Sequence, residues 1–141
     1  MGGALTDGDA DASGGDTTVN VTADTLNLLG NQAVTDIETT VATLDLATAA
    51  TSITETDGIA LAASEISGAL TLVASGAVTQ SGALDADSTA SVTAGANAIT
   101  LTNAGNDFTG AVSLSNSGSN DVALTDANAL DLGTVGVWAR T

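Results

Sequence analysis

From residue 17 onward, the sequence alternates aliphatic side chains with small or polar ones in short runs. A period of two places the aliphatic residues on one side of an extended chain and the Thr, Ser or Asp residues on the other. The runs are closed by Gly, Asn, Asp or Ser, which favour turns. The pattern therefore predicts many short β-strands, and the clearest runs are 25–28, 43–46, 58–61, 69–72, 98–101, 111–114, 121–124 and 129–132.

The stretch 33–52 is rich in Ala, so a helix is the competing interpretation there. Its many Thr residues and the lack of a sustained 3.6-residue period favour strand instead.

Apolar strand positions recur about every 20–23 residues in the second half of the chain. The three series are Leu70, Val92, Val112 and about Val135; Val78, Ile99 and Val122; and Leu84, Phe108 and Leu130. Three interleaved series with one common period predict an all-β solenoid, a right-handed parallel β-helix with about three short strands per coil. We expect five or six coils.

The composition suits a narrow core. Hydrophobic residues make up 43% of the 141 residues but aromatic ones only 1%, with one Phe, one Trp and no Tyr. A tube about one side chain wide needs Leu, Val, Ile and Ala rather than large rings. A compact antiparallel sandwich also uses short alternating strands and stays as the alternative, although the absence of Pro and the coil-length period favour the solenoid.

Charge and residue types exclude several chemistries. The chain has 17 acidic residues, one basic residue, no Cys and no His, giving a net charge of −16. Disulfides, thiolate or imidazole catalysis and zinc-finger sites are therefore absent. A chain this acidic repels nucleic acid and anionic membrane surfaces, and no apolar run approaches the length of a membrane span. We expect a protein that is not an enzyme.

The most distinct local motif lies in the acidic start of the chain. Asp7, Asp9, Asp11 and Asp16 alternate with small residues in a Gly-containing segment, and such carboxylates can bind calcium. The segment departs from the EF-hand pattern at the invariant glycine and at the terminal glutamate. A solvated acidic linker is the simpler interpretation of this segment. Calcium is the one cofactor that the sequence suggests.

Three parts of the chain differ in composition and in repeat pattern. We expect residues 1–16, rich in Gly and Asp, to be a flexible acidic lead-in and residues 17–135 to form the solenoid. Residues 136–141 leave the repeat pattern and contain Trp138 and Arg140, the only Trp and the only basic residue. They form either a tail or a terminal cap over the open end of the tube.

Two further patterns suggest activities that simpler interpretations also explain. Asp85 and Asp87 share the outer face of a predicted strand, and paired carboxylates serve in glycoside hydrolysis, but an exposed turn is the simpler interpretation.

Outward threonines could form an ice-binding face, but Ser113, Ala123 and Asp131 interrupt the rows, and ordinary β-propensity is the simpler explanation of Thr here. These threonines are Thr71, Thr100, Thr102 and Thr125. A group of asparagines at predicted turns is expected to be structural, since Asn suits left-handed backbone. The group consists of Asn97, Asn103, Asn106, Asn116, Asn120 and Asn128.

The run from Ile37 to Val135 resembles the repeat region of large filamentous-haemagglutinin-like exoproteins of Gram-negative bacteria. The segments that carry the resemblance are 37–62, 68–84, 92–115 and 120–135, including the Asn-Asp-Phe-x-Gly turn at 106–110 and the Asn-Ala-Leu-x-Leu-Gly-Thr-Val run at 128–135. The amino-terminal secretion domain of that family has no counterpart here.

The resemblance implies a right-handed β-helix in the shaft of a secreted or surface-held adhesin exported by a two-partner or autotransporter route. We therefore expect an extracellular or cell-surface stalk segment that acts as a rigid, non-catalytic spacer in cell adhesion. Its expected partners are neighbouring repeats of a larger parent chain, with host-surface or biofilm contacts. A calcium-dependent binding module and an ice-binding solenoid are the alternatives.

Overall fold

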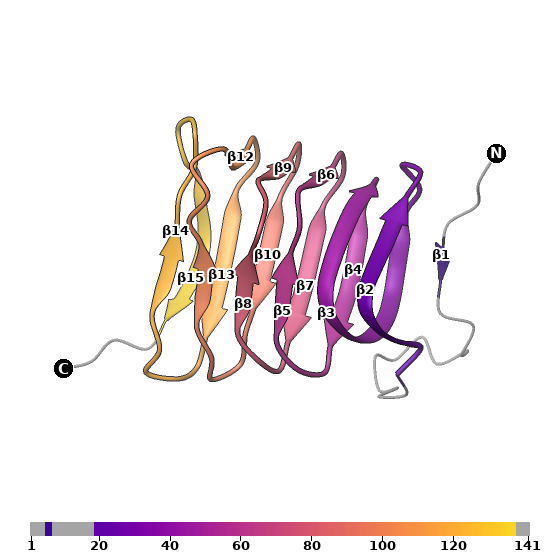
Figure 1. Cartoon of the computed structure of the whole chain (residues 1–141). Helices are drawn as coiled ribbons and strands as arrows, with labels where there is room; N and C mark the ends of the chain where they lie inside the picture. The colour runs from indigo at the N-terminus through magenta and orange to yellow at the C-terminus, as the bar shows by residue number, and fades with distance from the viewer. Residues whose placement is uncertain (1–4, 7–18, 138–141) are drawn as a thin grey trace.

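The chain forms a β-solenoid. The computed structural model describes residues 5–6 and 19–137, and in these residues it contains fifteen strands and no helix. All strand pairs among them are parallel, and the strands stack in about six turns (Figure 1). The predicted fold class is confirmed, and the antiparallel sandwich alternative is wrong.

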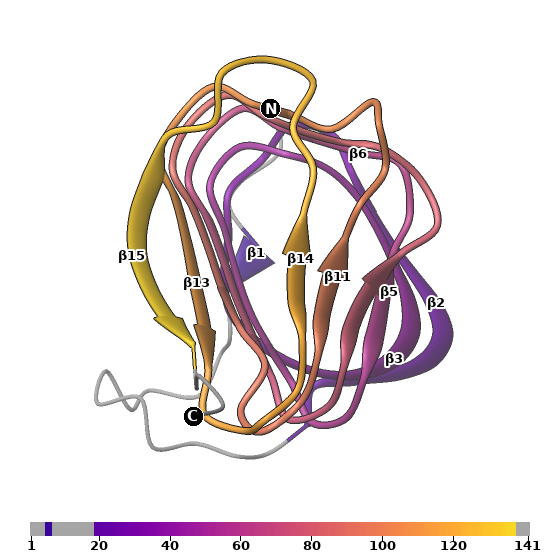
Figure 2. The same cartoon turned by 90° about the vertical axis from the view of Figure 1, so that its left-hand side faces the viewer.

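The strands lie on three faces of each coil, seen end-on in Figure 2. Face 1 contains β1 (Leu5–Thr6), the first part of β3 (Val34–Thr48), β4 (Thr51–Glu55), β7 (Leu70–Ala74), β10 (Ala90–Thr93), β13 (Val112–Asn116) and β15 (Leu132–Val137). Face 2 contains β2 (Val21–Leu29), the middle of β3, β5 (Ile59–Leu61), β8 (Val78–Gln80), β11 (Ile99–Leu101) and β14 (Val122–Leu124). Face 3 contains the end of β3, β6 (Ser64–Ile66), β9 (Leu84–Ala86) and β12 (Asp107–Phe108).

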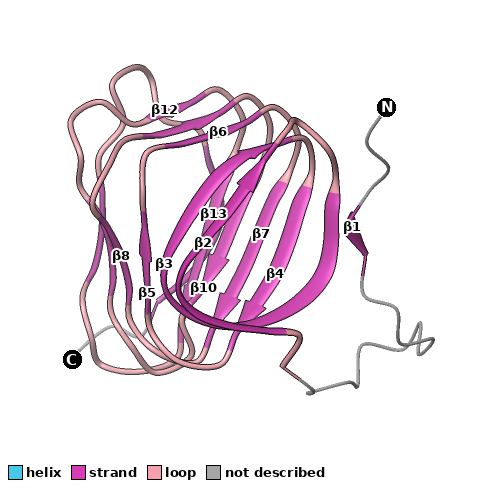
Figure 3. Ribbon diagram, turned by 45° about the vertical axis from the view of Figure 1, so that its right-hand side comes forward, coloured by secondary structure: helices cyan, strands magenta, loops and turns pink. Residues whose placement is uncertain are grey.

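The Ala-rich stretch forms the longest strand, β3, instead of a helix. It curves around the coil and pairs with β4 near its start, with β5 in its middle and with β6 at its end (Figure 3). Pairing with β2 along its other edge completes the hydrogen bonding of its second half. Backbone pairing on both sides therefore overrides the helix propensity of Ala, as tertiary context commonly does.

Alternation along each strand builds the core. In β7, Leu70, Leu72 and Ala74 are buried, whereas Thr71 and Val73 are exposed. Equivalent inward residues stack from coil to coil in columns along the axis. The core is consequently continuous and narrow, and Phe108 is the one aromatic residue among the buried core side chains that the structure describes.

One predicted series matches the structure residue for residue. Ile99 pairs with Val78 on one side and with Val122 on the other, and Val78 pairs in turn with Ile59. The predicted series Val78, Ile99 and Val122 is therefore confirmed as one column on face 2.

The first series is shifted by two residues. Leu70 pairs with Ala90, and Val92 pairs with Leu72 instead. Likewise Val135 pairs with Leu114 and not with Val112. A shift of two residues keeps the same side chains facing inward, so alternation alone does not fix which inward residue of one coil meets which of the next.

The third series is shifted by two residues at Phe108 and wrong at Leu130. Phe108 does stack in this corner, but opposite Ala86, since β12 pairs with β9 through Asp107 and Asp85. Leu130 lies outside the strands and is 38% exposed.

Glycine at the corners allows successive coils to approach closely. A Cβ on Gly82 would lie 2.3 Å from the backbone nitrogen of Ala63 in the preceding coil, and one on Gly76 would lie 2.4 Å from that of Gly58. No side chain fits at such distances. Gly-Ala-aliphatic triplets begin at residues 68, 76, 82 and 110, and each of these glycines marks a corner where coil meets coil.

We predict that Gly82→Ala destabilises the fold by about 1–3 kcal/mol, the usual cost of forcing extra atoms into a packed site. The measurement is the urea unfolding midpoint followed by circular dichroism. The matched control is Gly105→Ala, whose Cβ would have its nearest neighbours at 3.4 Å; it should shift the free energy by no more than about 0.5 kcal/mol. Equal effects of the two substitutions would contradict the close-approach role of Gly82.

Candidate functional site

The predicted calcium ligands Asp7, Asp9, Asp11 and Asp16 lie outside the described residues, so calcium binding there stays a prediction. Trp138 and Arg140, the residues of the predicted cap, also lie outside them. The candidate sites that can be built from the structure are an acidic row on face 3 and the polar groups buried at the corners.

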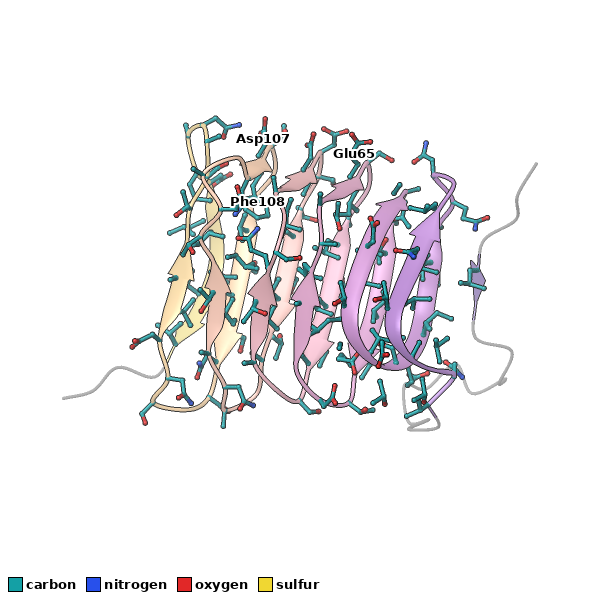
Figure 4. All side chains as sticks on the ribbon, in the orientation of Figure 1. Glu65, Asp107 and Phe108 are labelled. Carbon is teal, nitrogen blue, oxygen red and sulfur yellow. The ribbon has the colours of Figure 1, made fainter. Side chains whose placement is uncertain are left out.

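Carboxylates from three coils form a row on the outside of face 3, which we call the acidic ladder. Glu65 of β6 pairs in register with Asp85 of β9, and Asp85 pairs with Asp107 of β12. Figure 4 shows Glu65 and Asp107 at this edge of the coils, with Phe108 below them. Asp87 lies on the same outer face as Asp85, as the sequence predicted, because the residue between them is buried.

The ladder places like charges beside one another. The pKa of Asp85 is raised above its ordinary value of 3.8, first by desolvation and then by the negative charges of Asp87, Asp107 and Glu65. Neighbouring parallel strands lie about 4.8 Å apart, so the carboxylates follow one another in single file. The Nδ2 atom of Asn128 donates a hydrogen bond to Asp107 at 2.5 Å.

The geometry of the ladder suits loose attraction of counterions better than a chelate. Within residues 5–6 and 19–137, no group of three or more acidic, His or Cys residues could hold a metal ion. Beside the ladder runs an open groove of about 380 Å³. Besides Glu65 and Asp85, its lining includes Ala63, Ala83 and Gly105, whose short or absent side chains offer little to orient a ligand.

A second polar group was not foreseen from the sequence. Glu55 ends β4 and is fully buried. Its Oε2 atom accepts hydrogen bonds from the Thr39 hydroxyl at 2.6 Å and from the Val41 amide at 3.2 Å. Its Oε1 atom accepts from the Thr56 amide at 3.1 Å. The alternation of the strand could have revealed this residue, because Glu55 stands two residues after the buried Ile53.

The hydrogen bonds around Glu55 stabilise a buried carboxyl group at this corner. Burial raises its pKa, and the hydrogen bonds from Thr39 and Val41 oppose that rise. These bonds hold the end of β4 against β3 of the preceding coil. Glu55 therefore serves to join two coils where the regular ladder of backbone hydrogen bonds is interrupted.

Asn106 joins three coils at the corner before β12. It is fully buried, and its Oδ1 atom accepts hydrogen bonds from Gln80 Nε2 at 2.8 Å and from the Leu84 amide at 3.0 Å. Its Nδ2 atom lies 3.1 Å from each of three acceptors: Gln80 Oε1, the Leu101 carbonyl and the Thr125 carbonyl. These contacts explain why Asn106, and not Phe108, is the partner of Leu84.

The other five asparagines predicted to support turns also make side-chain hydrogen bonds. Asn97 donates to the Ser75 carbonyl at 2.8 Å, and Asn116 and Asn120 donate to the carbonyls of Asn97 and Ala96. In these three cases the acceptor belongs to the preceding coil. The predicted structural role of the asparagines is confirmed, but it rests on these hydrogen bonds and not on left-handed backbone, since Asn31 is the one non-glycine residue with a positive φ among the described residues.

The four predicted outward threonines do not form one row. Thr71 lies on face 1, in register with Ser52 and Ser91, whereas Thr100 lies on face 2, in register with Ala123. Thr102 and Thr125 follow the ends of β11 and β14, and Thr125 is half-buried. The regular threonine face on which the ice-binding alternative depends is therefore not assembled from these residues.

We predict that Asp85→Asn stabilises the fold at neutral pH and low salt. A raised pKa means that folding disfavours the ionised carboxylate, so the penalty is absent below about pH 3.8 and complete above the raised pKa. The gain in urea midpoint should accordingly be largest at pH 7, vanish near pH 3 and shrink in high salt.

The control for this prediction is Asp24→Asn, which removes an exposed charge on β2, away from the ladder. It changes the net charge by the same amount and should give a smaller gain at pH 7. A gain from Asp85→Asn that persisted unchanged at pH 3, or that equalled the control at every pH, would show that the ladder does not strain the fold.

Comparisons with known proteins give one similarity. A family model described as "Repeats of unknown function (DUF5649)" matches residues 47–115, just under half of the chain. Neither a curated protein nor a solved structure matches the chain. Among the described residues, no helix is long and apolar enough to cross a membrane. The matched segment runs from the end of β3 through most of β13, and this similarity supports a repeat protein built from stacked coils.

Proposed function

We propose that this chain is a rigid, non-catalytic spacer: a stalk segment of a large secreted or surface-attached bacterial exoprotein of the filamentous-haemagglutinin type, acting in cell adhesion. The observation that carries the proposal is the parallel, in-register pairing of successive coils on three faces around one continuous core. Because each coil contacts its neighbours, length is set by the number of coils, which is the property a spacer needs.

The packing supports stiffness along the axis. Side chains from one coil fill the column next to those of the following coil, as with Leu72, which pairs with Ile53 on one side and with Val92 on the other. Corner side chains such as Glu55 and Asn106 add hydrogen bonds between coils. Bending the rod would separate coils on one side and so break both kinds of contact.

The surface supports the same role. The chain has a net charge of −16. Most carboxylates of the described residues lie on loops and outer faces, with Glu55 and Glu38 as buried exceptions. Like charge keeps neighbouring rods soluble and apart. The resemblance of residues 37–135 to exoprotein repeats supports the part of this proposal that concerns location, namely a spacer outside the cell among neighbouring repeats of a parent chain.

The proposal predicts that an added coil lengthens the rod. Leu70 pairs directly with Ala90, so residues 70–89 make one coil, and a second copy of them inserted after residue 89 should stack in register. Small-angle X-ray scattering should then show an unchanged cross-section and a length greater by about 4.8 Å. The urea midpoint should not fall, because stability adds up coil by coil.

The control is a flexible Gly/Ser insert of the same length at the same place, which should form a loop and leave the rod length unchanged. If the duplicated coil behaved like this insert, the coils would not be interchangeable units, and the spacer role would lose its basis.

A second experiment separates a spacer from a binding module. The folded chain, fixed to beads through an added terminal tag, should show no saturable binding to cultured epithelial cells, with calcium or with EDTA. The control bead carries an unrelated acidic protein of similar net charge. Saturable binding that appears only with calcium would contradict the spacer proposal and favour the calcium-dependent binding module.

A further inference from the structure

The corner where β3 and β4 pass from face 1 to face 2 contains a fully buried acid. Pairing of β3 with β4 ends at Thr39, and pairing of β3 with β5 begins at Thr43. In this gap, the Val41 amide donates to both oxygens of the Glu55 carboxyl group at 3.2 Å. The side chain of Glu55, which has no exposed surface, therefore takes the place of a backbone carbonyl in joining β3 to the next coil.

A second carboxyl group reaches this corner. The side chain of Asp57, in the segment that follows β4, forms a hydrogen bond with Glu55. Two carboxyl groups can form such a bond only when one of them carries a proton, because an ionised carboxylate has no donor. Asp57 is exposed and lines an open groove of about 460 Å³, so it connects the buried group to solvent. The geometry thus holds one proton between a buried and an exposed carboxyl group.

Among the described residues, no positive charge faces this pair, because the single basic residue of the chain, Arg140, lies outside them. The described acids that flank the corner are Glu38, buried on β3, and Asp24 of β2, which lines the same groove as Asp57. The strands β5 and β7 contain no titratable residue. Ionising both members of the pair therefore places two negative charges at one corner without a cation, which a buried site strongly disfavours.

We propose that the Glu55–Asp57 pair is a proton-controlled joint between two coils, closed while the pair holds its proton and loosened when both groups ionise. In the closed joint, Glu55 binds the Thr39 hydroxyl and the Val41 amide and so holds β3. When both groups are ionised, Asp57 turns into the groove, water solvates Glu55, and the Val41 amide loses its acceptor. Only this corner opens, because β3 stays paired with β4 and β5 on either side of it.

The direction of the effect follows from burial. Desolvation raises the pKa of Glu55 above its ordinary value of 4.5; the hydrogen bonds from Thr39 and Val41 oppose that rise, and the bond with Asp57 adds to it. The closed corner therefore keeps its proton to a higher pH than the open corner does. The joint is fully closed below about pH 4.5, and its stability is lost as the pH rises to the raised pKa. In that interval opening releases one proton, so the opening equilibrium constant rises about tenfold per pH unit.

The test is NMR of the full chain between about pH 3 and pH 8, which follows the carboxyl carbon of Glu55 and the hydrogen exchange of the Val41 amide. The carboxyl signal should titrate with a midpoint above 4.5. Protection of Val41, corrected for intrinsic exchange, should fall about tenfold per pH unit up to that midpoint and then level off. Protection of the Ile99 amide, on a strand paired on both sides, should not follow this midpoint.

Two variants make the test specific. Glu55→Gln mimics the protonated form, since its amide keeps an oxygen for Val41 and gains a donor, so it should abolish the pH dependence at Val41. Asp57→Asn removes the second negative charge and should lower the midpoint of Glu55. Asp57 is exposed, so this variant keeps the test decisive even where Glu55→Gln fails to fold. The matched control is Asp121→Asn, an exposed acid before β14, which should leave the midpoint unchanged.

Three results would overturn the proposal: a Glu55 midpoint at or below 4.5, Val41 protection that does not follow the midpoint, or an Asp57→Asn variant with the midpoint of the natural chain. The outcome is separate from that of the spacer role. A Glu55 that titrates as an ordinary glutamate would remove the joint and leave the spacer proposal, which coil duplication tests, standing.

Discussion

Parallel pairing of each coil with the next is the interaction on which the rest of this structure depends. A single coil has too few apolar side chains to bury its own inner face, and only stacking closes the core. The column through Ile59, Val78, Ile99 and Val122 illustrates this. Val78 and Ile99 have coils on both sides and are fully buried. Val122 lies in the last described coil of that face and is half-exposed. The fold is therefore a sum of neighbour contacts rather than one central core.

The narrow core accounts for the unusual composition. A tube lined by two or three inward residues per strand has room for Leu, Val and Ile, and corners such as Gly82 leave no room for a side chain. Polar residues enter the interior where hydrogen bonds to two coils satisfy them, as Asn106 shows. The described acidic residues lie mostly outside, where the Glu65–Asp85–Asp107 ladder shows the cost of repeating one charge at the same position in three successive coils.

Period-two alternation predicted the strands, and the recurrence of apolar positions about every 20–23 residues predicted the parallel stacking and the three faces, because inward residues must be apolar in successive coils. It could not assign register, since Ala90 and Val92 both face inward and either could meet Leu70. It also missed Glu55, whose burial depends on Thr39 and Val41 of another coil. Where successive coils differ in length, the geometry of the corners determines which residues meet. The repeat period alone gives no information about that geometry.

Amide hydrogen exchange of the monomeric chain tests the central claim, stability through stacking on neighbours, most directly. The account predicts the slowest exchange in β7 and β10, which have coils on both sides, with protection falling toward β14 and β15, which pair on one side only among the described residues. Equal protection along the stack, or the strongest protection in the last coil, would contradict it.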